Sequence, residues 1–258
     1  MKKTFLIITI LLVSIFFTFA DTKNIVYSKS FDLTSIENID VSLTYENLQI
    51  SRIYGEEIVV EIGSNNIKKI PDVFIEDGLL KIKSKEQKVV RGNKCNVYIY
   101  LPQDFNAQSI ELQNISGNIN ADILEAQNSI LLSNVSGRTD VGNIKTELLT
   151  ANSVSGNITL QKLKIDYFET SSTDGNIFLE LEQSPQATCQ ITNISGKTQL
   201  YYPKTSDFDI VAFTISGNIK SDTSENQNVG TTYRTTIGSG GAQISISSIS
   251  GKIEFIGY

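Results

Sequence analysis

A five-residue pattern, apolar-Ser-Gly-polar-apolar, recurs through the second half of the chain. One copy is Ile115-Ser116-Gly117-Asn118-Ile119, and the other copies keep the glycine with small changes around it. The seven glycines are Gly117, Gly137, Gly156, Gly175, Gly196, Gly217 and Gly251. Successive glycines are 20, 19, 19, 21, 21 and 34 residues apart. This spacing indicates a repeat architecture in which each unit is one turn of the chain.

Hydrophobic and polar residues keep fixed places relative to each glycine. The residue seven positions before the glycine is always apolar, from Ile110 in the first unit to Ile244 in the last. The residue three positions before it is always small and polar, as at Asn114 and Asn134. The alternation predicts short strands with one buried face. The small polar residue predicts a corner where its side chain bonds to the backbone, and the glycine permits close backbone approach there.

Units of about 20 residues with two or three short strands each predict an all-β fold, a single-chain β-solenoid. Coils stacked at about 4.8 Å would align the apolar positions into one continuous core. A leucine-rich repeat has a similar period but a different pattern, and a propeller blade needs about 40 residues. We therefore expect a solenoid without helices after the N-terminal leader.

Three regions are expected. Residues 1–20 would be a leader, 21–108 an N-terminal β region, and 109–258 the repeat-containing solenoid. The N-terminal region lacks the pentad but contains a strand pattern with a hairpin turn at Asp77-Gly78. It is expected to begin or cap the solenoid, because an uncovered end would expose unpaired strand edges. A polar insertion at about 221–241 would either project as a binding loop or close the C-terminal end.

The leader has the pattern of a secretory signal peptide. Lys2 and Lys3 precede an apolar run that ends at Phe19, and small residues flank a cut after Ala20. The run of about 15 residues is short for a hydrocarbon core of about 30 Å, and no later segment is apolar enough to span a membrane. We expect cleavage after Ala20 and a location in the periplasm, on the outer surface or outside the cell.

Composition removes several kinds of chemistry. The chain has no histidine, no tryptophan and two cysteines, so it cannot form a Ser-His-Asp triad, a Cys-His dyad or a histidine zinc site. The formal net charge is −6, and loss of the two leader lysines leaves 20 basic and 28 acidic residues, a net charge of −8. This charge argues against a nucleic-acid partner. We expect no catalytic residue, cofactor or metal site, and we expect Cys95 and Cys189 to be separate buried thiols.

The order of these features resembles a known family. A strand follows Gly78, an alternating strand ends at Leu101-Pro102, and a closing Gly-Gly-x-x-I-x-I-x-x-[IV]-S-G unit runs from Gly240 to Gly251. With the S-G-[ND]-I units between them, the chain resembles the bacterial putative-adhesin domain-of-unknown-function family over roughly residues 30–258. The resemblance implies a β-solenoid and supplies no catalytic residue.

We expect an exported, non-enzymatic, adhesin-like binding or structural protein of the cell envelope, whose partner is an envelope protein or a glycan. The candidate binding face consists of Asn118, Arg138, Asn157, Asn176, Lys197, Asn218 and Lys252, each directly after a glycine. Many weak contacts along this row would act together, and deletion of 221–241 would abolish binding. An exposed aromatic patch is a further possibility, although cover by a neighbouring strand is favoured for Tyr98, Tyr100, Tyr201, Tyr202 and Phe208.

Two alternatives stay open. A carbohydrate-active enzyme on a β-helix, a polysaccharide lyase or glycosidase, would need two carboxylates that converge on one sugar. A self-assembling envelope scaffold would need an uncapped terminal coil.

Overall fold

The computed structural model describes residues 24–85, 94–222 and 228–258. The leader and part of the insertion lie outside the described residues. Almost all regular structure is strand, and the helical segments of the described part are two three-residue 3-10 turns, Leu33–Ser35 and Ile67–Lys69. The prediction of an all-β repeat fold is confirmed.

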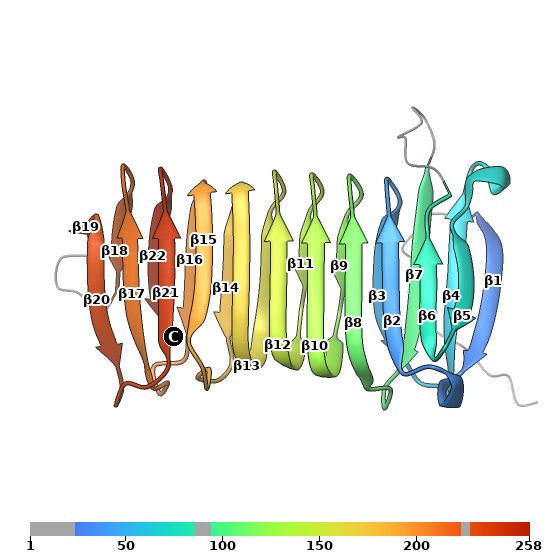
Figure 1. Ribbon diagram of the computed structural model, residues 1–258, viewed down its shortest axis with the longest axis horizontal. Coiled ribbons are helices and arrows are strands. Elements are labelled where there is room, and N and C mark those ends of the chain that lie inside the picture. Colours follow the sequence, from blue (N-terminus) through green and yellow to red (C-terminus); the bar gives the residue numbers. More distant parts are fainter. Residues whose placement is uncertain (1–23, 86–93, 223–227) are drawn as a thin grey trace, which may run out of the picture.

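The strands form two long rows that face each other, one on each broad side of the molecule (Figure 1). The row in front of Figure 1 contains, in spatial order, β5 (Asp72–Glu76), β6 (Leu79–Lys83), β2 (Asn38–Leu43), β8 (Ala107–Asn114), β10 (Leu124–Asn134), β12 (Ile144–Ser153), the end of β13 (Ile158–Asp174), β15 (Cys189–Ser195), β21 (Gln243–Ser248), β17 (Phe208–Thr214) and β20 (Thr232–Ile237).

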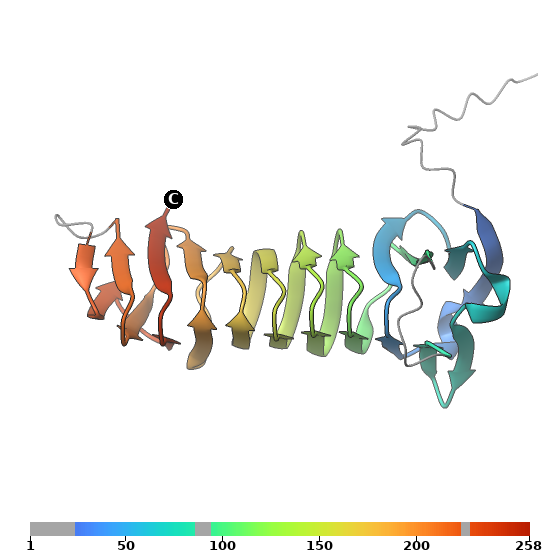
Figure 2. The same ribbon diagram turned by 90° about the horizontal axis from the view of Figure 1, so that it is seen from above.

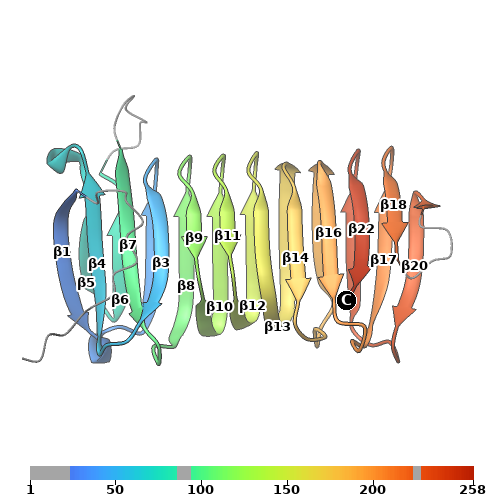
Figure 3. The same ribbon diagram turned by 180° about the vertical axis from the view of Figure 1, so that it is seen from behind.

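The second row lies behind the first, and β13 belongs to both (Figure 3). It contains, in spatial order, β1 (Ile25–Asp32), β4 (Glu57–Ser64), β7 (Cys95–Pro102), β3 (Asn47–Ile53), β9 (Ile119–Ala121), β11 (Thr139–Val141), the start of β13, β14 (Ile177–Leu181), β16 (Lys197–Tyr202), β22 (Lys252–Gly257), β18 (Asn218–Ser221) and β19 (Asn228–Gly230).

The core lies between the two rows (Figure 2). Parallel pairing places Ile110 beside Ile130, Ile130 beside Leu149, and Leu149 beside Phe168. All four side chains are buried, as are the residues seven and five positions before the glycine in every unit. Because the register is parallel and direct, equivalent apolar residues stack into one continuous core.

The order in space departs from the order in sequence at both ends. Strand β21 pairs in parallel with both β15 and β17, and β22 pairs in parallel with both β16 and β18. The last coil of the chain therefore lies between two earlier ones. At the other end, β2 lies between β6 and β8, and β3 lies between β7 and β9. Both terminal coils thus have paired neighbours on two sides.

The outermost strands run antiparallel to the rows. At the C-terminal end, β20 pairs with β17 and β19 with β18. The Tyr233 ring of β20 stacks on Phe255, with 5.8 Å between ring centroids. The insertion was expected either to project as a loop or to close the C-terminal end. Its described part lies against the last coils and does not project from them. The sequence pattern did not indicate this pairing.

Cys95 and Cys189 are free, buried thiols, as predicted. Burial raises the pKa of Cys95 to about 12, with a further contribution from the nearby Glu46 carboxylate, and raises the pKa of Cys189 to about 11, from an ordinary value of 9.0. Because the thiolate is the reactive form, native protein at pH 8 should not react with a thiol-specific disulfide reagent, whereas two thiols should react after unfolding in denaturant. Rapid stoichiometric labelling of native protein would contradict this prediction.

The same shifts define a pH effect on stability. A folded-state pKa above the unfolded value means that the thiols' contribution is complete below pH 9.0 and is lost as pH rises toward 11 to 12. The free energy of unfolding should therefore fall across this interval, and a Cys189→Ala variant should lose less stability over it than the parent.

Candidate functional site

The seven repeat glycines form one stack along the corner between the rows, in the spatial order Gly117, Gly137, Gly156, Gly175, Gly196, Gly251 and Gly217. A Cβ atom on Gly156 would lie 1.8 Å from the carbonyl oxygen of Gly137. At all seven glycines the corresponding distance to the neighbouring coil's carbonyl oxygen is 1.8 to 2.3 Å. No side chain fits at that distance, so glycine is required for the coils to stack at this corner.

The small polar residue before each glycine holds the corner together. The Asn134 side chain is 1% exposed, its Nδ2 donates to the Gly117 carbonyl at 2.9 Å, and its Oδ1 accepts from the Gly137 N–H at 3.0 Å. In the next coil the Ser153 hydroxyl accepts from the Gly156 N–H at 2.8 Å. These bonds satisfy backbone groups that would otherwise be buried without partners.

Replacing Asn134 with alanine should lower the free energy of unfolding by about 2 kcal/mol, because a buried N–H and a buried carbonyl each lose a partner. Asn134→Ser should lose less, since Ser153 performs half of this role in the next coil. The control is Asn152→Ala, an outward residue whose side chain makes one bond, to Ser171. Thermal unfolding followed by circular dichroism checks the prediction, and equal losses for Asn134→Ala and Asn152→Ala would refute it.

The candidate face from the sequence lies on the outer side of this corner, where the structure brings its seven residues into one row. Four of them are exposed and Lys197, Asn218 and Lys252 are partly buried. Several are used within the protein. The Oδ1 atoms of Asn118 and Asn157 each accept the backbone N–H of the next row residue at 2.9 Å.

The cations of the row also have partners. Lys197 and Lys252 both pair with Glu254, the first at 2.6 Å, and Arg138 pairs with Asp140 at 3.5 Å. The row therefore connects neighbouring coils. Its exposed members also form a surface that a partner can contact.

A second row was missed from the sequence. The apolar residue two positions before the glycine is 42% to 63% exposed at Ile115, Val135, Val154, Ile194, Ile215 and Ile249. The sequence contained a sign of this row. The alternation of inward and outward residues shifts by one position at the corner, and this shift turns the residue outward. The adjacent serines bond back to the neighbouring coil, as Ser136 does to the Ile115 carbonyl at 3.1 Å.

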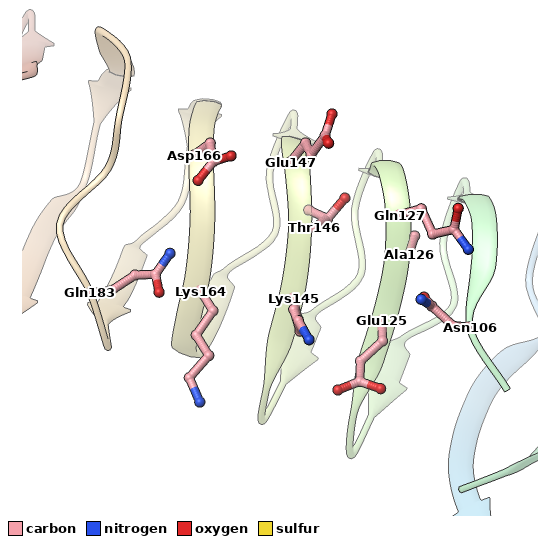
Figure 4. Close-up of a pocket in the computed structure, with 10 residues that line it drawn as sticks. All are labelled: Asn106, Glu125, Ala126, Gln127, Lys145, Thr146, Glu147, Lys164, Asp166 and Gln183. Carbon is pink, nitrogen blue, oxygen red and sulfur yellow. The ribbon is translucent and has the colours of Figure 1, made fainter. Parts of the chain in front are cut away.

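A groove of about 280 Å³ crosses the narrow side of five successive turns of the chain, from Asn106 to Gln183 (Figure 4). Lys145 and Lys164 lie side by side in register at its lower edge, and Glu147 and Asp166 point outward at its upper edge. Lys164 pairs with Glu182 at 3.0 Å. The two carboxylates are exposed, whereas glycoside hydrolysis needs one carboxyl group shielded enough to stay protonated. The third carboxylate of the groove, Glu125, is half-buried and pairs with Arg52 at 3.6 Å, so the groove is a surface of mixed charge.

A hollow of about 300 Å³ lies on the broad face formed by β3, β9, β11 and β13 (Figure 3). It is lined by Gln49, Asn120, Ala121, Asp122, Asp140, Val141, Gly142, Thr159 and Gln161. Thr159 pairs in register with Phe178, whose ring lies 5.0 Å from the Tyr201 ring at an angle of 37°. The hollow is therefore a polar depression, and the aromatic pair begins on the next strand, outside its lining.

Only one residue of this aromatic pair, Tyr201, was a candidate from the sequence. Tyr201 is half-buried on the outer face, but Phe178 was not singled out. Two other members of the considered patch are in the core, where Tyr202 is 1% and Phe208 0% exposed and their rings meet edge to face at 5.2 Å. Cover, the favoured expectation for these residues, is confirmed for Tyr202 and Phe208, because alternation turns both side chains inward.

The part of the chain that the structure describes has no group of three or more His, Cys, Asp or Glu residues that could hold a metal ion. Within the same residues, no helix has the length and apolar character needed to cross a membrane.

These features define an all-β repeat protein whose stacked coils are joined at a glycine corner. The chain belongs to the Toastrack DUF4097 family, whose family model matches residues 36–190 and 155–255. The resemblance to a putative-adhesin family of unknown function is thereby confirmed.

Solved structures are similar to the chain over most of its length, at low identity and with TM-scores below 0.5. A putative cell adhesion protein from Clostridium sporogenes is 14% identical, with a TM-score of 0.41 over 90% of this chain and 98% of that chain. A putative adhesin from Bacteroides fragilis is 15% identical, with a TM-score of 0.47 over 89% and 96%. A putative lipid binding protein from Parabacteroides distasonis is 14% identical, with a TM-score of 0.49 over 89% and 96%. No curated protein matches the chain.

Proposed function

We propose that the protein is an exported, non-catalytic β-solenoid of about 20-residue coils with an N-terminal β cap, and that it acts as an adhesin-like binding protein of the cell envelope. The proposal rests on where the side chains of each repeat lie and what they contact. Inward side chains form the core and corner side chains join the coils. The surfaces left for function are long, rigid and repeated, which suits a partner that makes many weak contacts.

The outward carboxylates support a binding role over an enzymatic one. Three acids share the groove of Figure 4: Glu147 and Asp166 are exposed on neighbouring strands, and Glu125 is half-buried and paired with Arg52 at 3.6 Å. A glycosidase or lyase would need two acids that converge on one sugar in a site that excludes water. Glu147 and Asp166 instead face solvent, and Glu125 is held by the arginine.

The ends of the stack also support a discrete binding protein over a self-assembling scaffold. The edge strand β5 begins and ends in the charged residues Asp72 and Glu76, which pair with Lys85 at 3.0 Å and with Lys81 at 2.5 Å. Charged side chains on an edge strand oppose pairing with another chain. Antiparallel strands at both ends also interrupt the parallel register by which further coils could add.

Export rests on the leader pattern of residues 1–20. The test expresses the full chain in a bacterial host with a cell envelope and determines the mature N-terminus by mass spectrometry. Cleavage after Ala20 with recovery from the envelope or medium supports export. An intact Met1 or Lys2 terminus on cytoplasmic protein overturns it.

The binding role is tested with the mature chain on a glycan array and on isolated envelope fractions. A triple variant, Arg138→Ala with Lys197→Ala and Lys252→Ala, should weaken binding about tenfold or more, while each single change has an effect of about threefold or less. The charge-matched control replaces Lys83, Lys145 and Lys164, which lie away from the row. Deleting 221–241 is not a clean test, because β20 pairs with β17 and its loss would uncover the last coil. Folded protein that binds no envelope component or glycan would refute the proposal, and released sugar products would favour the enzyme.

A further inference from the structure

We infer that the hollow on β3, β9, β11 and β13 binds an uncharged glycan. The inference rests on the proposed binding function and names the partner's chemistry. Gly142 lines the hollow, between Asp122 and Gln161 at the equivalent positions of the two adjacent coils. The rest of the lining is amide, carboxylate and hydroxyl, with Asn120, Asp140 and Thr159 in one line across three strands.

The polar atoms of the hollow are available to a ligand. Within the described residues, the side chains of Asn120, Asp122 and Gln161 make no hydrogen bond or ion pair with the protein. An amide offers both donors and acceptors, and a carboxylate offers acceptors only. A sugar hydroxyl can donate and accept at once, so this mixture of groups matches a row of hydroxyls.

The aromatic pair supplies the second element of sugar recognition. Thr159 of the lining is in register with Phe178 on β14, and Glu180 of that strand is in register with Tyr201 on β16. Both rings are half-buried, so each is fixed by its neighbours while part of it faces solvent. The apolar C–H face of a pyranose can pack on such rings while its hydroxyls reach the amides of the hollow.

Charge selects an uncharged sugar. Asp122 and Asp140 lie in the lining and Glu180 beside it, and Arg138 next to the hollow is paired with Asp140 at 3.5 Å. A uronic acid or phosphate group would meet these three carboxylates. Protein partners fit less well, because the lining lacks the apolar centre of a typical interface.

The groove of Figure 4 and the exposed Ile and Val line lack the features that suit the hollow to a glycan. The groove of Figure 4 combines lysines and carboxylates without an aromatic wall. The exposed Ile and Val line is one residue wide, and nothing in the structure shows what would cover it.

The test is affinity electrophoresis of the mature chain in native gels that contain soluble amylose, a mixed-linkage β-glucan, a mannan, a galactan or polygalacturonate. At least one of the four uncharged polymers should retard the protein, equally in low and high salt, and polygalacturonate should not. Phe178→Ala should raise the apparent Kd for that polymer about tenfold, and Asn120→Ala with Gln161→Ala should raise it by a similar factor.

Matched controls lie on the opposite face. Phe213→Ala removes a ring that is 48% exposed on β17, and Asn152→Ala with Gln190→Ala removes an amide pair, so both should change the Kd by about twofold or less. Retardation by no uncharged polymer, or equal retardation of all variants, would overturn the inference. If no uncharged polymer retards the chain but the chain binds an envelope protein, the inference fails and the proposed binding function stands. If nothing binds, both fail.

Discussion

Replacing Gly156 with alanine should lower the thermal midpoint by about 10 °C, corresponding to a loss of about 4 kcal/mol in the free energy of unfolding. The added Cβ would lie 1.8 Å from the Gly137 carbonyl oxygen and 2.8 Å from its carbon. Both atoms are backbone and belong to a bonded corner, so they cannot move aside as a flexible side chain would. The adjacent coils must separate locally, which weakens the hydrogen bonds of the corner on both sides.

The matched control is Gly55→Ala, in the turn between β3 and β4. The nearest atom to a Cβ at that position is Cδ1 of Ile53 at 3.9 Å, so the methyl group has room. Alanine there should leave the midpoint unchanged or raise it slightly, because it reduces the freedom of the unfolded chain. Differential scanning calorimetry of the two variants compares the effects directly. A Gly156→Ala protein as stable as Gly55→Ala would show that the coils do not stack at this distance.

The sequence predicted the interior of the repeats well because each position there has one physical role. Ile130 must be apolar to face the core, and Asn134 must be small and polar to bond at the corner. Gly137 must lack a side chain to admit the carbonyl of Gly117. A period of about 20 residues multiplies these constraints, so the pattern emerges from the chain without any knowledge of its structure.

The order of coils at the ends could not be predicted in the same way. All coils have equivalent parallel strand edges. The sequence pattern therefore does not determine which coils are neighbours in space. The 34-residue step before Gly251 was the only sign that the last coil is unusual. The hollow was missed for a related reason. Its lining includes Gly142, which lies outside the repeated pentad, and the aromatic neighbour of Thr159 in space, Phe178, is 19 residues away in the sequence.

The insertion of the last coil between two earlier ones leads to the final prediction. Phe255→Ala, in the last strand that the structure describes, should reduce the free energy of unfolding by about 4 kcal/mol. The side chain is 1% exposed, with Leu200 beside it on β16, Ser221 on β18, and the Tyr233 ring stacked on it at 5.8 Å. Truncation to alanine leaves a cavity lined by β16, β18 and β20, and β16 and β18 pair with β22 on its two sides.

The control is Phe213→Ala, the same change at a ring that is 48% exposed on the adjacent β17, which should alter stability by about 0.5 kcal/mol or less. Hydrogen exchange gives an independent measurement. Chain termini usually fray, but the amides of β21 and β22 should exchange as slowly as those of β12, because each strand is bonded on both sides. Fast exchange in β22, or an unchanged free energy of unfolding in Phe255→Ala, would mean that the last coil lies at the open end of the stack. Slow exchange together with a large loss of stability would show that the terminal coil holds its two neighbours together.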